Sequence, residues 1–405
     1  MIRAMALRAN LPLAPGTTPR LRPGDSDDVV RHRESSASVL ADMARGLRTA
    51  SVNARVVAGM YTRRLQFAGP RILQIRVPAT CDHHCVFCIS LSSESAERRS
   101  GTATFDYDRC LRLMDRASEL GTLKFNLCSL GETLLFPKLK PLILHIRDAS
   151  RGAAVIKLVT HGTAIADVGI DFFLENRTHF WLSLHGGDFE TWHRIHRSDA
   201  SDPRAQFDRL RRSIRALTSS RRCPVTLHNV VSVHNYDKLA GILDFALETG
   251  VRDLSFTAVR GFSKHMLGEP ERARLRAELP ALRRAMRKHG VRTNLGSFVL
   301  DLASEDGAGP RHWAKNGSGF YNTKRCYIGW LMTFVDVDGR IVPCCRGKEL
   351  GNIDRDDFAD VWHGPYAEFR RRSVSIASSG PPPGYDCEHC SHVGLNEKAN
   401  RLVRF

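Results

Sequence analysis

Six segments with strand character follow one another between residues 71 and 259, and helical patterns separate them. The helical pattern is clearest at residues 107–120 and 236–250. The strand segments are residues 71–77, 123–130, 154–160, 179–184, 224–233 and 253–259. A regular strand–helix alternation predicts an α/β fold with a parallel sheet, which is either open or closed into a partial barrel.

The segments on either side of this array have a different character. A Pro/Gly-rich lead and a helical pattern precede it, whereas a charged helical pattern, a Gly/Ser/Asn-rich connector (304–319) and a hairpin pattern around Asp338-Gly339 follow it. The last helix is expected at 357–372. We therefore predict a helical N-terminal extension (1–70), the strand–helix array (71–262), a helix with a connector (263–325) and a small α+β domain (326–405).

Three cysteines lie within eight residues in CDHHCVFC, directly after the first predicted strand. Cys81, Cys85 and Cys88 have the spacing C-x3-C-x2-C. Parallel α/β folds place their active sites at the C-terminal ends of the strands, where this loop begins. A structural zinc site needs four ligands, so His83 or His84 would have to complete it. A cubane iron–sulfur cluster held by three thiolates instead leaves one iron open.

This cysteine spacing, with Phe87 before the third cysteine, resembles the signature of the radical S-adenosylmethionine (SAM) enzymes. The resemblance continues along the chain to about residue 260. LGETLL (130–135) resembles the GGEP motif of the family, VTHGT (159–163) its TNGT turn, and SLHGG (183–187) its SLDG segment. ETWHRIHR (190–197) resembles the segment that follows.

The resemblance implies a partial (β/α)6 barrel in which SAM chelates the open iron of a [4Fe–4S] cluster on Cys81, Cys85 and Cys88. An electron from the cluster cleaves SAM, and the resulting 5′-deoxyadenosyl radical abstracts a hydrogen atom from the substrate. The family pattern assigns the amino group of SAM to Glu132, the ribose to Ser183 and the carboxylate to His196 or Arg197. Phe87, Thr160 and Asn235 match further cofactor-binding positions.

A second set of cysteines lies in the predicted C-terminal domain. Cys326, Cys344, Cys387 and Cys390 supply four thiolates, which suit either zinc or a complete cubane cluster. Next to a radical SAM barrel they resemble the SPASM and twitch auxiliary-cluster domains, with a spacing closer to the single-cluster twitch form. Cys345 could replace Cys344 as a ligand. Cys110 and Cys223 are expected to be ordinary buried thiols.

Strand alternation predicts which side chains face the lumen of the barrel. Cys128 shares the parity of Glu132, so it is a candidate hydrogen-atom donor, although a small buried core residue is the commoner role. The other inward positions make the lumen polar and partly cationic: Lys124, Asn126, Lys157, His161, Trp181, Ser183, His185, Thr226, His228 and Ser232. An isolated inward histidine such as His228 is more often structural than functional.

Three functions are compatible with these motifs. The first choice is a radical SAM oxidoreductase that dehydrogenates or epimerises a hydroxylated small molecule such as a sugar, an aminocyclitol or a nucleoside. The alternative is maturation of a ribosomally synthesised peptide by crosslinking, epimerisation or side-chain oxidation. The third is a zinc-stapled binding protein without enzymatic activity. Either enzyme needs a reductant, such as flavodoxin or ferredoxin.

The composition limits the classes of binding partner and the cellular locations that are expected. The 60 Lys and Arg residues exceed the 43 Asp and Glu residues, which gives a net charge of +17. The arginines are dispersed and no nucleic-acid-binding signature accompanies them, so a nucleic-acid partner is not expected. No apolar run approaches the roughly 18 residues that span a membrane, and the N-terminus lacks the pattern of a secretory signal. A cytoplasmic location is the default expectation.

Overall fold

The computed structural model describes residues 36–63, 65–90, 105–259, 262–296, 298, 319–344 and 347–403. Cys345 and nearly all of the predicted connector lie outside the described residues. The chain divides into two compact units, residues 1–44 and 45–405. Helix α1 (Ser36–Thr62) crosses this division. Residues 1–35 of the predicted helical extension lie outside the described residues. The sheet, its helices and the C-terminal cysteines belong to the second unit.

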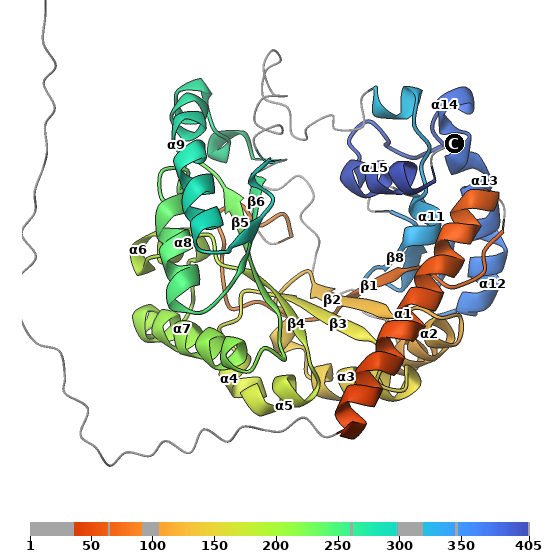
Figure 1. Cartoon of the computed structure of the whole chain (residues 1–405), viewed down its shortest axis with the longest axis horizontal. Coiled ribbons are helices and arrows are strands. Elements are labelled where there is room, and N and C mark those ends of the chain that lie inside the picture. The colour runs from red at the N-terminus through yellow and green to blue at the C-terminus, as the bar shows by residue number, and fades with distance from the viewer. Residues whose placement is uncertain are drawn as a thin grey trace, which may run out of the picture. The chain divides into compact units, whose positions relative to one another are not determined.

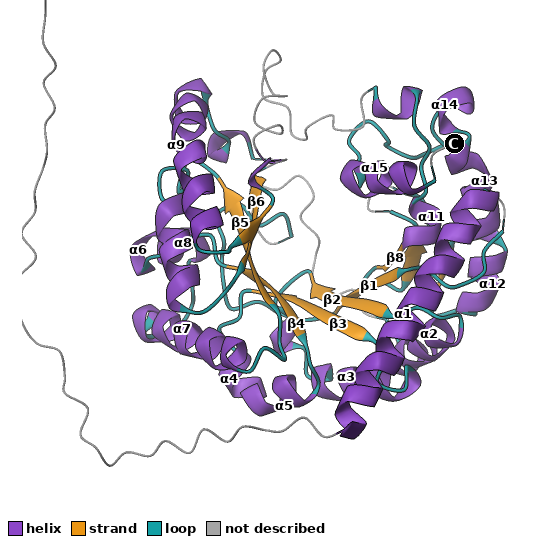
Figure 2. Ribbon diagram, viewed as in Figure 1, coloured by secondary structure: helices purple, strands orange, loops and turns teal. Residues whose placement is uncertain are grey.

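The six predicted strands form the centre of one sheet and pair in chain order, all parallel (Figures 1 and 2). They are β1 (Ile72–Val77), β2 (Lys124–Ser129), β3 (Val155–Thr160), β4 (His179–Ser183), β5 (Val225–Val231) and β6 (Asp253–Ala258). This arrangement confirms the predicted α/β fold with a partial (β/α)6 barrel. The C-terminal ends of all six strands therefore lie at one edge of the sheet.

Four short strands extend the sheet to ten. β7 (Arg292–Thr293) pairs with β6, and β8 (Met332–Val335) pairs in parallel with β1. β9 (Arg340–Val342) and β10 (Gly351–Asn352) continue antiparallel beyond β8. The β8–β9 turn is the hairpin predicted around Asp338-Gly339, where Gly339 adopts a φ of 78°. No pattern in the sequence indicates that this hairpin joins the barrel sheet next to β1.

Helices alternate with the central strands. They are α2 (Tyr107–Glu119), α3 (Leu139–Ala149), α4 (Ile165–Val168), α5 (Ile170–Glu175), α6 (Phe189–His196), α7 (Pro203–Ser219), α8 (Leu239–Glu248) and α9 (Glu269–Lys288). Aspartates begin three of them: the carboxylates of Asp106, Asp188 and Asp202 each accept a backbone N–H from the first turn.

The C-terminal helices are α11 (Ile328–Leu331), α12 (Phe358–His363), α13 (Pro365–Val374), α14 (Ile376–Ser379) and α15 (Val393–Leu402). Three 3-10 turns complete the described elements: η1 (Thr133–Leu135), η2 (Ser263–His265) and η3 (Phe320–Asn322). Helices α12 and α13 cover the region predicted as one helix at 357–372. They are separate because Gly364 and Pro365 interrupt the helical hydrogen bonds.

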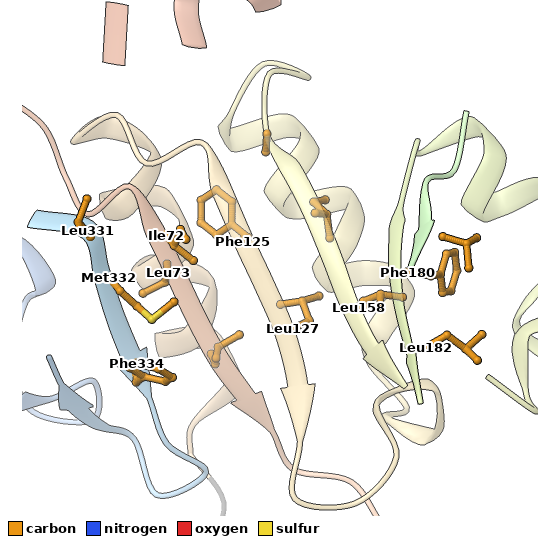
Figure 3. Close-up of a cluster of buried hydrophobic side chains, with 14 of the residues drawn as sticks. Ile72, Leu73, Phe125, Leu127, Leu158, Phe180, Leu182, Leu331, Met332 and Phe334 are labelled. Carbon is orange, nitrogen blue, oxygen red and sulfur yellow. The ribbon is translucent and has the colours of Figure 1, made fainter. Parts of the chain in front are cut away.

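The two faces of the central strands differ in burial as strand alternation predicts. One face carries fully buried apolar side chains, including Leu73, Phe125, Leu127 and Leu158 (Figure 3). The alternate positions are half-buried and polar, for example Gln74, Lys157 and His228. No helix of the described residues is long and apolar enough to cross a membrane.

Candidate active site and cysteine cavity

Backbone hydrogen bonds hold the loop of Cys81, Cys85 and Cys88 against the C-terminal end of α6. The pairs are His84 N to the carbonyl oxygens of His196 and Arg197 (both 3.1 Å), Val86 N to Ile195 O (3.0 Å) and Asp199 N to Asp82 O (3.0 Å). His83 and Ser198 form an isolated antiparallel bridge in the same region. The three cysteines are thus placed at the C-terminal edge of the sheet by a segment more than a hundred residues away in sequence.

A second contact fixes the start of the loop to the end of β2. The Glu132 N–H donates to the carbonyl oxygen of Thr80 at 2.8 Å. A Cβ atom on Gly131 would lie 2.4 Å from the carbonyl oxygens of both Ala79 and Thr80. The LGETLL motif therefore requires glycine at this position so that the cysteine loop can approach it.

The carboxylate of Glu132 is buried, with 1% of the residue exposed. One oxygen accepts from Leu134 N (2.8 Å) and from the Thr160 hydroxyl (2.5 Å), and the other accepts from His161 N (2.9 Å). These protein donors occupy both oxygens. The structure thus gives Glu132 and Thr160 a role in joining the ends of β2 and β3, and their predicted contacts to SAM stay predictions.

His161 stands where the family pattern has asparagine. Its Nε2 lies 2.9 Å from Asp82 Oδ1 and 3.1 Å from Glu132 Oε2. Burial disfavours its charged form, but the Glu132 and Asp82 carboxylates and a hydrogen bond to Cys81 outweigh that cost and raise the pKa of His161 to about 10. The imidazolium therefore links the cysteine loop electrostatically to the end of β2.

The ligand atoms of Cys81, Asp82, His83 and His161 lie within 4.8 Å of one another, a grouping that also suits a metal ion. A divalent ion here would have to displace the proton that Asp82 and Glu132 stabilise on His161. The two histidines of the zinc alternative differ in placement. His83 is buried and burial lowers its pKa to about 3, whereas His84 pairs with Asp199 at 3.0 Å on the exposed side.

The two candidates for the SAM carboxylate, His196 and Arg197, have different surroundings. His196 is buried; its Nε2 donates to Leu184 O at 3.0 Å, and its Nδ1 lies 3.6 Å from Cys85 Sγ. Burial, with the nearby rings of His185 and His83, holds the pKa of His196 well below its ordinary value. Arg197 follows with a left-handed φ of 48° and an exposed side chain.

Phe87, Ser183 and Asn235 all lie at the same edge of the sheet. Phe87 packs edge-on against the ring of His185 at 5.3 Å, and the buried Asn235 amide donates to His185 O at 2.7 Å. Asn235 Oδ1 also accepts from the backbone N–H of Ser232. Ser183 ends β4, half-buried, in register with His228. The structure thus gathers the predicted cofactor-binding residues beside the cysteine loop.

Cys128 lies on the inner face of the sheet with 8% of the residue exposed. Its thiol donates to the carbonyl oxygen of Ile75 at 3.4 Å, and Gln74 Nε2 lies 3.5 Å from the sulfur. Burial raises the pKa of this thiol to about 11. The neighbouring inward side chain, Arg76, bonds both carboxylate oxygens of Asp336 at 3.2 and 3.3 Å. This ion pair joins β1 to the end of β8.

An aromatic and cationic group lies further along the inner face. The ammonium of Lys157 is 4.5 Å from the ring centre of Trp181, whose ring lies 5.1 Å from that of His228. Burial, with the charge of Lys124, lowers the pKa of Lys157 to about 8. Burial and Lys157 lower that of His228 to about 4. Within the described residues no carboxylate forms an ion pair with Lys157.

The four C-terminal cysteines meet in one cavity. Cys326, Cys344, Cys387 and Cys390 all line it, with largely apolar walls that include Ile328 and Phe369. Burial raises the pKa of Cys326 to about 12 and that of Cys387 to about 11, so four bare thiolates would be costly there. A bound cationic group removes this cost by favouring the deprotonated sulfurs. The donor set and the cavity therefore fit an auxiliary cluster.

Two thiols outside these groups lie as predicted. Cys110 and Cys223 are buried in the hydrophobic core, with 0% and 2% exposure. The sequence did not point to two other residues: His161 as a link between the two motifs, and Tyr321, whose hydroxyl lies 3.2 Å from Cys390 Sγ. His161 belongs to the VTHGT motif, but its linking role depends on contacts to Asp82 and Glu132, which are distant in sequence. Tyr321 belongs to none of the motifs.

Comparisons with known proteins agree with this geometry. Residues 326–391 match the family model of SPASM, an iron–sulfur cluster-binding domain. A PqqA peptide cyclase of Xanthomonas campestris pv. campestris is 25% identical over 317 residues, 74% of this chain and 76% of the relative. The counterpart from Ruegeria pomeroyi is 25% identical over 300 residues, 71% of this chain and 74% of the relative.

Two solved structures share the fold. The anSMEcpe structure with bound AdoMet matches with a TM-score of 0.54 at 14% identity, covering 82% of this chain and 98% of the other. Streptococcus suis SuiB bound to its precursor peptide SuiA matches with a TM-score of 0.51 at 14% identity, covering 82% and 71%. At these identities the two structures establish a common fold.

Proposed function

The chain is a radical S-adenosylmethionine enzyme with a C-terminal SPASM domain, and on that premise we propose that it modifies a peptide substrate. The observation that carries this proposal is the match to PqqA peptide cyclases over about three-quarters of both chains. It favours the peptide alternative over the small hydroxylated molecule that the motifs alone put first. SuiB, a neighbour in fold, binds the precursor peptide SuiA.

The residues at the edge of the sheet fit the cofactors of such an enzyme. Cys81, Cys85 and Cys88 would hold a [4Fe–4S] cluster, which supplies the electron that cleaves SAM to the 5′-deoxyadenosyl radical. The backbone bonds to α6 and to the LGETLL turn hold these thiols in place. The Asp82–His161–Glu132 contacts keep the loop and the motif together while the cofactors bind.

We assign the contact to the SAM carboxylate to Arg197 rather than to His196. Both ring nitrogens of His196 already face protein atoms, Leu184 O and Cys85 Sγ, and its neutral ring carries no charge to attract a carboxylate. Arg197 is next in the chain, exposed, and permanently charged. Ser183 and Asn235 remain the candidates for the ribose and the adjoining polar contacts.

The inner face of the sheet is the proposed binding surface for the reacting part of the peptide. Trp181 and His228 offer flat rings, and Lys157 offers a cation that no carboxylate of the described chain neutralises. The Arg76–Asp336 pair lies where the barrel sheet meets β8 of the SPASM segment. A substrate on this face would lie on the sheet in which β1 precedes the cysteine loop and pairs with β8.

Oxidation fits this site better than epimerisation. The Cys128 thiol donates to a backbone carbonyl of its own sheet, which turns its hydrogen away from the lumen. A cluster on the four C-terminal cysteines would supply a one-electron acceptor. With it, loss of one hydrogen atom, one electron and one proton, the proton going to solvent, would give a product two hydrogens lighter than the substrate, with one new bond. A flavodoxin or ferredoxin is the proposed source of electrons for cleavage.

The test is mass spectrometry of a defined peptide. The protein is reconstituted with iron and sulfide without oxygen, reduced with dithionite, and incubated with SAM and a synthetic peptide encoded by a short reading frame, if sequencing finds one beside its gene. The expected product is two hydrogens lighter than the peptide, with 5′-deoxyadenosine formed in equal amount. An unchanged peptide, together with oxidation of an aminocyclitol or nucleoside offered in parallel, would reverse the choice of substrate class.

A further inference from the structure

Tyr321 forms a hydrogen bond to one of the four cysteine sulfurs in the C-terminal cavity. Its hydroxyl oxygen lies 3.2 Å from Cys390 Sγ, and its side chain lines the same cavity. Tyr321 precedes the segment that matches the SPASM family model, residues 326–391. The match to the SPASM family model therefore gives no information on the contact between Tyr321 and Cys390.

The direction of this hydrogen bond follows from the partners of Asn396. The backbone N–H of Tyr327 can only donate, and it lies 2.7 Å from Asn396 Oδ1, so that atom is the amide oxygen. The Asn396 Nδ2 group must then donate to the Tyr321 hydroxyl oxygen at 3.0 Å. The tyrosine oxygen is thus an acceptor toward Asn396, which leaves its own proton for Cys390 Sγ. A Cys390 that ligates a cluster is a thiolate without a proton, so in this bond Tyr321 is the donor.

This relay is buried. Asn396 has 0%, Tyr327 1% and Tyr321 6% exposure. Water therefore has little access to compete for the hydrogen bond between the Tyr321 hydroxyl and Cys390 Sγ. A backbone N–H, from His392, also lies 3.3 Å from the same sulfur.

We propose that Tyr321 raises the reduction potential of the auxiliary cluster through this hydrogen bond. A donor to a ligating sulfur stabilises the reduced cluster, which carries one more negative charge, more than it stabilises the oxidised one. Asn396 is the positioning residue that orients the hydroxyl. The result is a better electron acceptor in the C-terminal cavity. The inference depends on the auxiliary cluster alone and holds whichever substrate the enzyme takes.

The test is a potentiometric titration followed by electron paramagnetic resonance. It uses the full chain with Cys81, Cys85 and Cys88 replaced by alanine, so that the C-terminal cluster is the sole signal. Tyr321→Phe should make the midpoint potential more negative and leave the iron content unchanged. The matched control is Tyr385→Phe, since Tyr385 lines the same cavity and no hydrogen bond joins its hydroxyl to a cysteine sulfur among the described residues.

A second variant keeps the test decisive if Tyr321→Phe loses the cluster. Replacement of Tyr321 by 3-fluorotyrosine preserves the shape of the ring and makes the hydroxyl a stronger donor, so the midpoint potential should become less negative. Shifts in opposite directions for the two variants support the proposal. A potential in either variant equal to that of the Tyr385→Phe control would overturn it. Both readouts are independent of the peptide experiment, because no substrate is present.

Discussion

The backbone of Gly131 lies against the carbonyl group of Thr80, so close that a Cβ atom would fall 2.4 Å from the carbonyl oxygen. The Glu132 N–H bonds to that same oxygen at 2.8 Å. The residue before the first cysteine is thereby fixed to the turn after β2. The end of β2 thus sets the position of the cysteine loop, which follows β1.

This contact predicts the effect of Gly131→Ala. The added methyl group must push the cysteine loop away, because the atoms it meets are backbone carbonyls that cannot rotate aside. The variant should lose about half of its iron, the four atoms of one cubane, and all cleavage of SAM. Iron analysis and 5′-deoxyadenosine assay check this. Gly241→Ala is the control, since nothing lies within 4 Å of its added Cβ; equal losses in both variants would contradict the account.

Cys387→Ala should affect only the C-terminal cavity. The variant removes one of four sulfurs that line it and leaves the loop after β1 untouched. About four of about eight irons should be lost, and product formation should fall much more than SAM cleavage. Cys223→Ala removes a buried thiol that belongs neither to the cysteine loop after β1 nor to the C-terminal cavity. This variant should keep all of the iron. Full product yield from Cys387→Ala would mean that the C-terminal site has only a structural role.

Cys128→Ala separates oxidation from epimerisation. Because the thiol hydrogen is engaged by Ile75 O, the variant is expected to retain most of its turnover and to yield the same product, two hydrogens lighter than the substrate. Turnover of the unaltered enzyme in deuterium oxide should leave no deuterium on the reacting carbon. A deuterated isomer of unchanged hydrogen count, absent from the Cys128→Ala reaction, would identify Cys128 as a hydrogen-atom donor instead.

The buried charge of Lys157 should lower the free energy of unfolding at neutral pH. Burial lowers its pKa from 10.5 to about 8, so between these two pH values the unfolded chain binds more protons and stability rises with pH. Below pH 8 the penalty is constant, at most roughly 3 kcal/mol. Lys157→Met should therefore unfold at a higher temperature at pH 7, with a gain that vanishes toward pH 10.5, as scanning calorimetry of the anaerobic holoenzyme would measure.

The control for this prediction is Lys140→Met, because Lys140 is exposed on α3 and its replacement should change stability by less than about 0.5 kcal/mol. A Lys157→Met variant that is less stable than the parent protein at neutral pH would mean that the ammonium has a favourable partner in solution. A gain would identify the lysine as a residue kept for function at the expense of stability.

The fold was largely predictable because its signals are local. Alternation along β2 and β3 separates Phe125 and Ile156 on one face from Asn126 and Lys157 on the other, and the structure has the same two faces. The pairing of β8 with β1 was not predictable, since it joins Met332 to Ile72 across the whole barrel. His185 does not follow the alternation of side chains between the two faces of the sheet, because its φ of 61° turns the chain after β4.

The site was predictable only in part, for a related reason. Cysteine spacing pointed to Cys81, Cys85 and Cys88, but no spacing reveals that Glu132 is already occupied by Leu134, Thr160 and His161. That network depends on two strand ends that meet only in the folded chain. The Tyr321–Asn396 relay likewise links positions 75 residues apart.

The most direct test of the central assignment is 5′-deoxyadenosine release by the reconstituted, dithionite-reduced protein and its Cys81→Ala variant, measured without oxygen. Two thiolates cannot hold a cubane with one defined open iron, so the unaltered protein should form 5′-deoxyadenosine from SAM and the variant should form none. Cleavage by Cys81→Ala at the rate of the unaltered protein would contradict the assignment of the radical-generating site to the loop after β1.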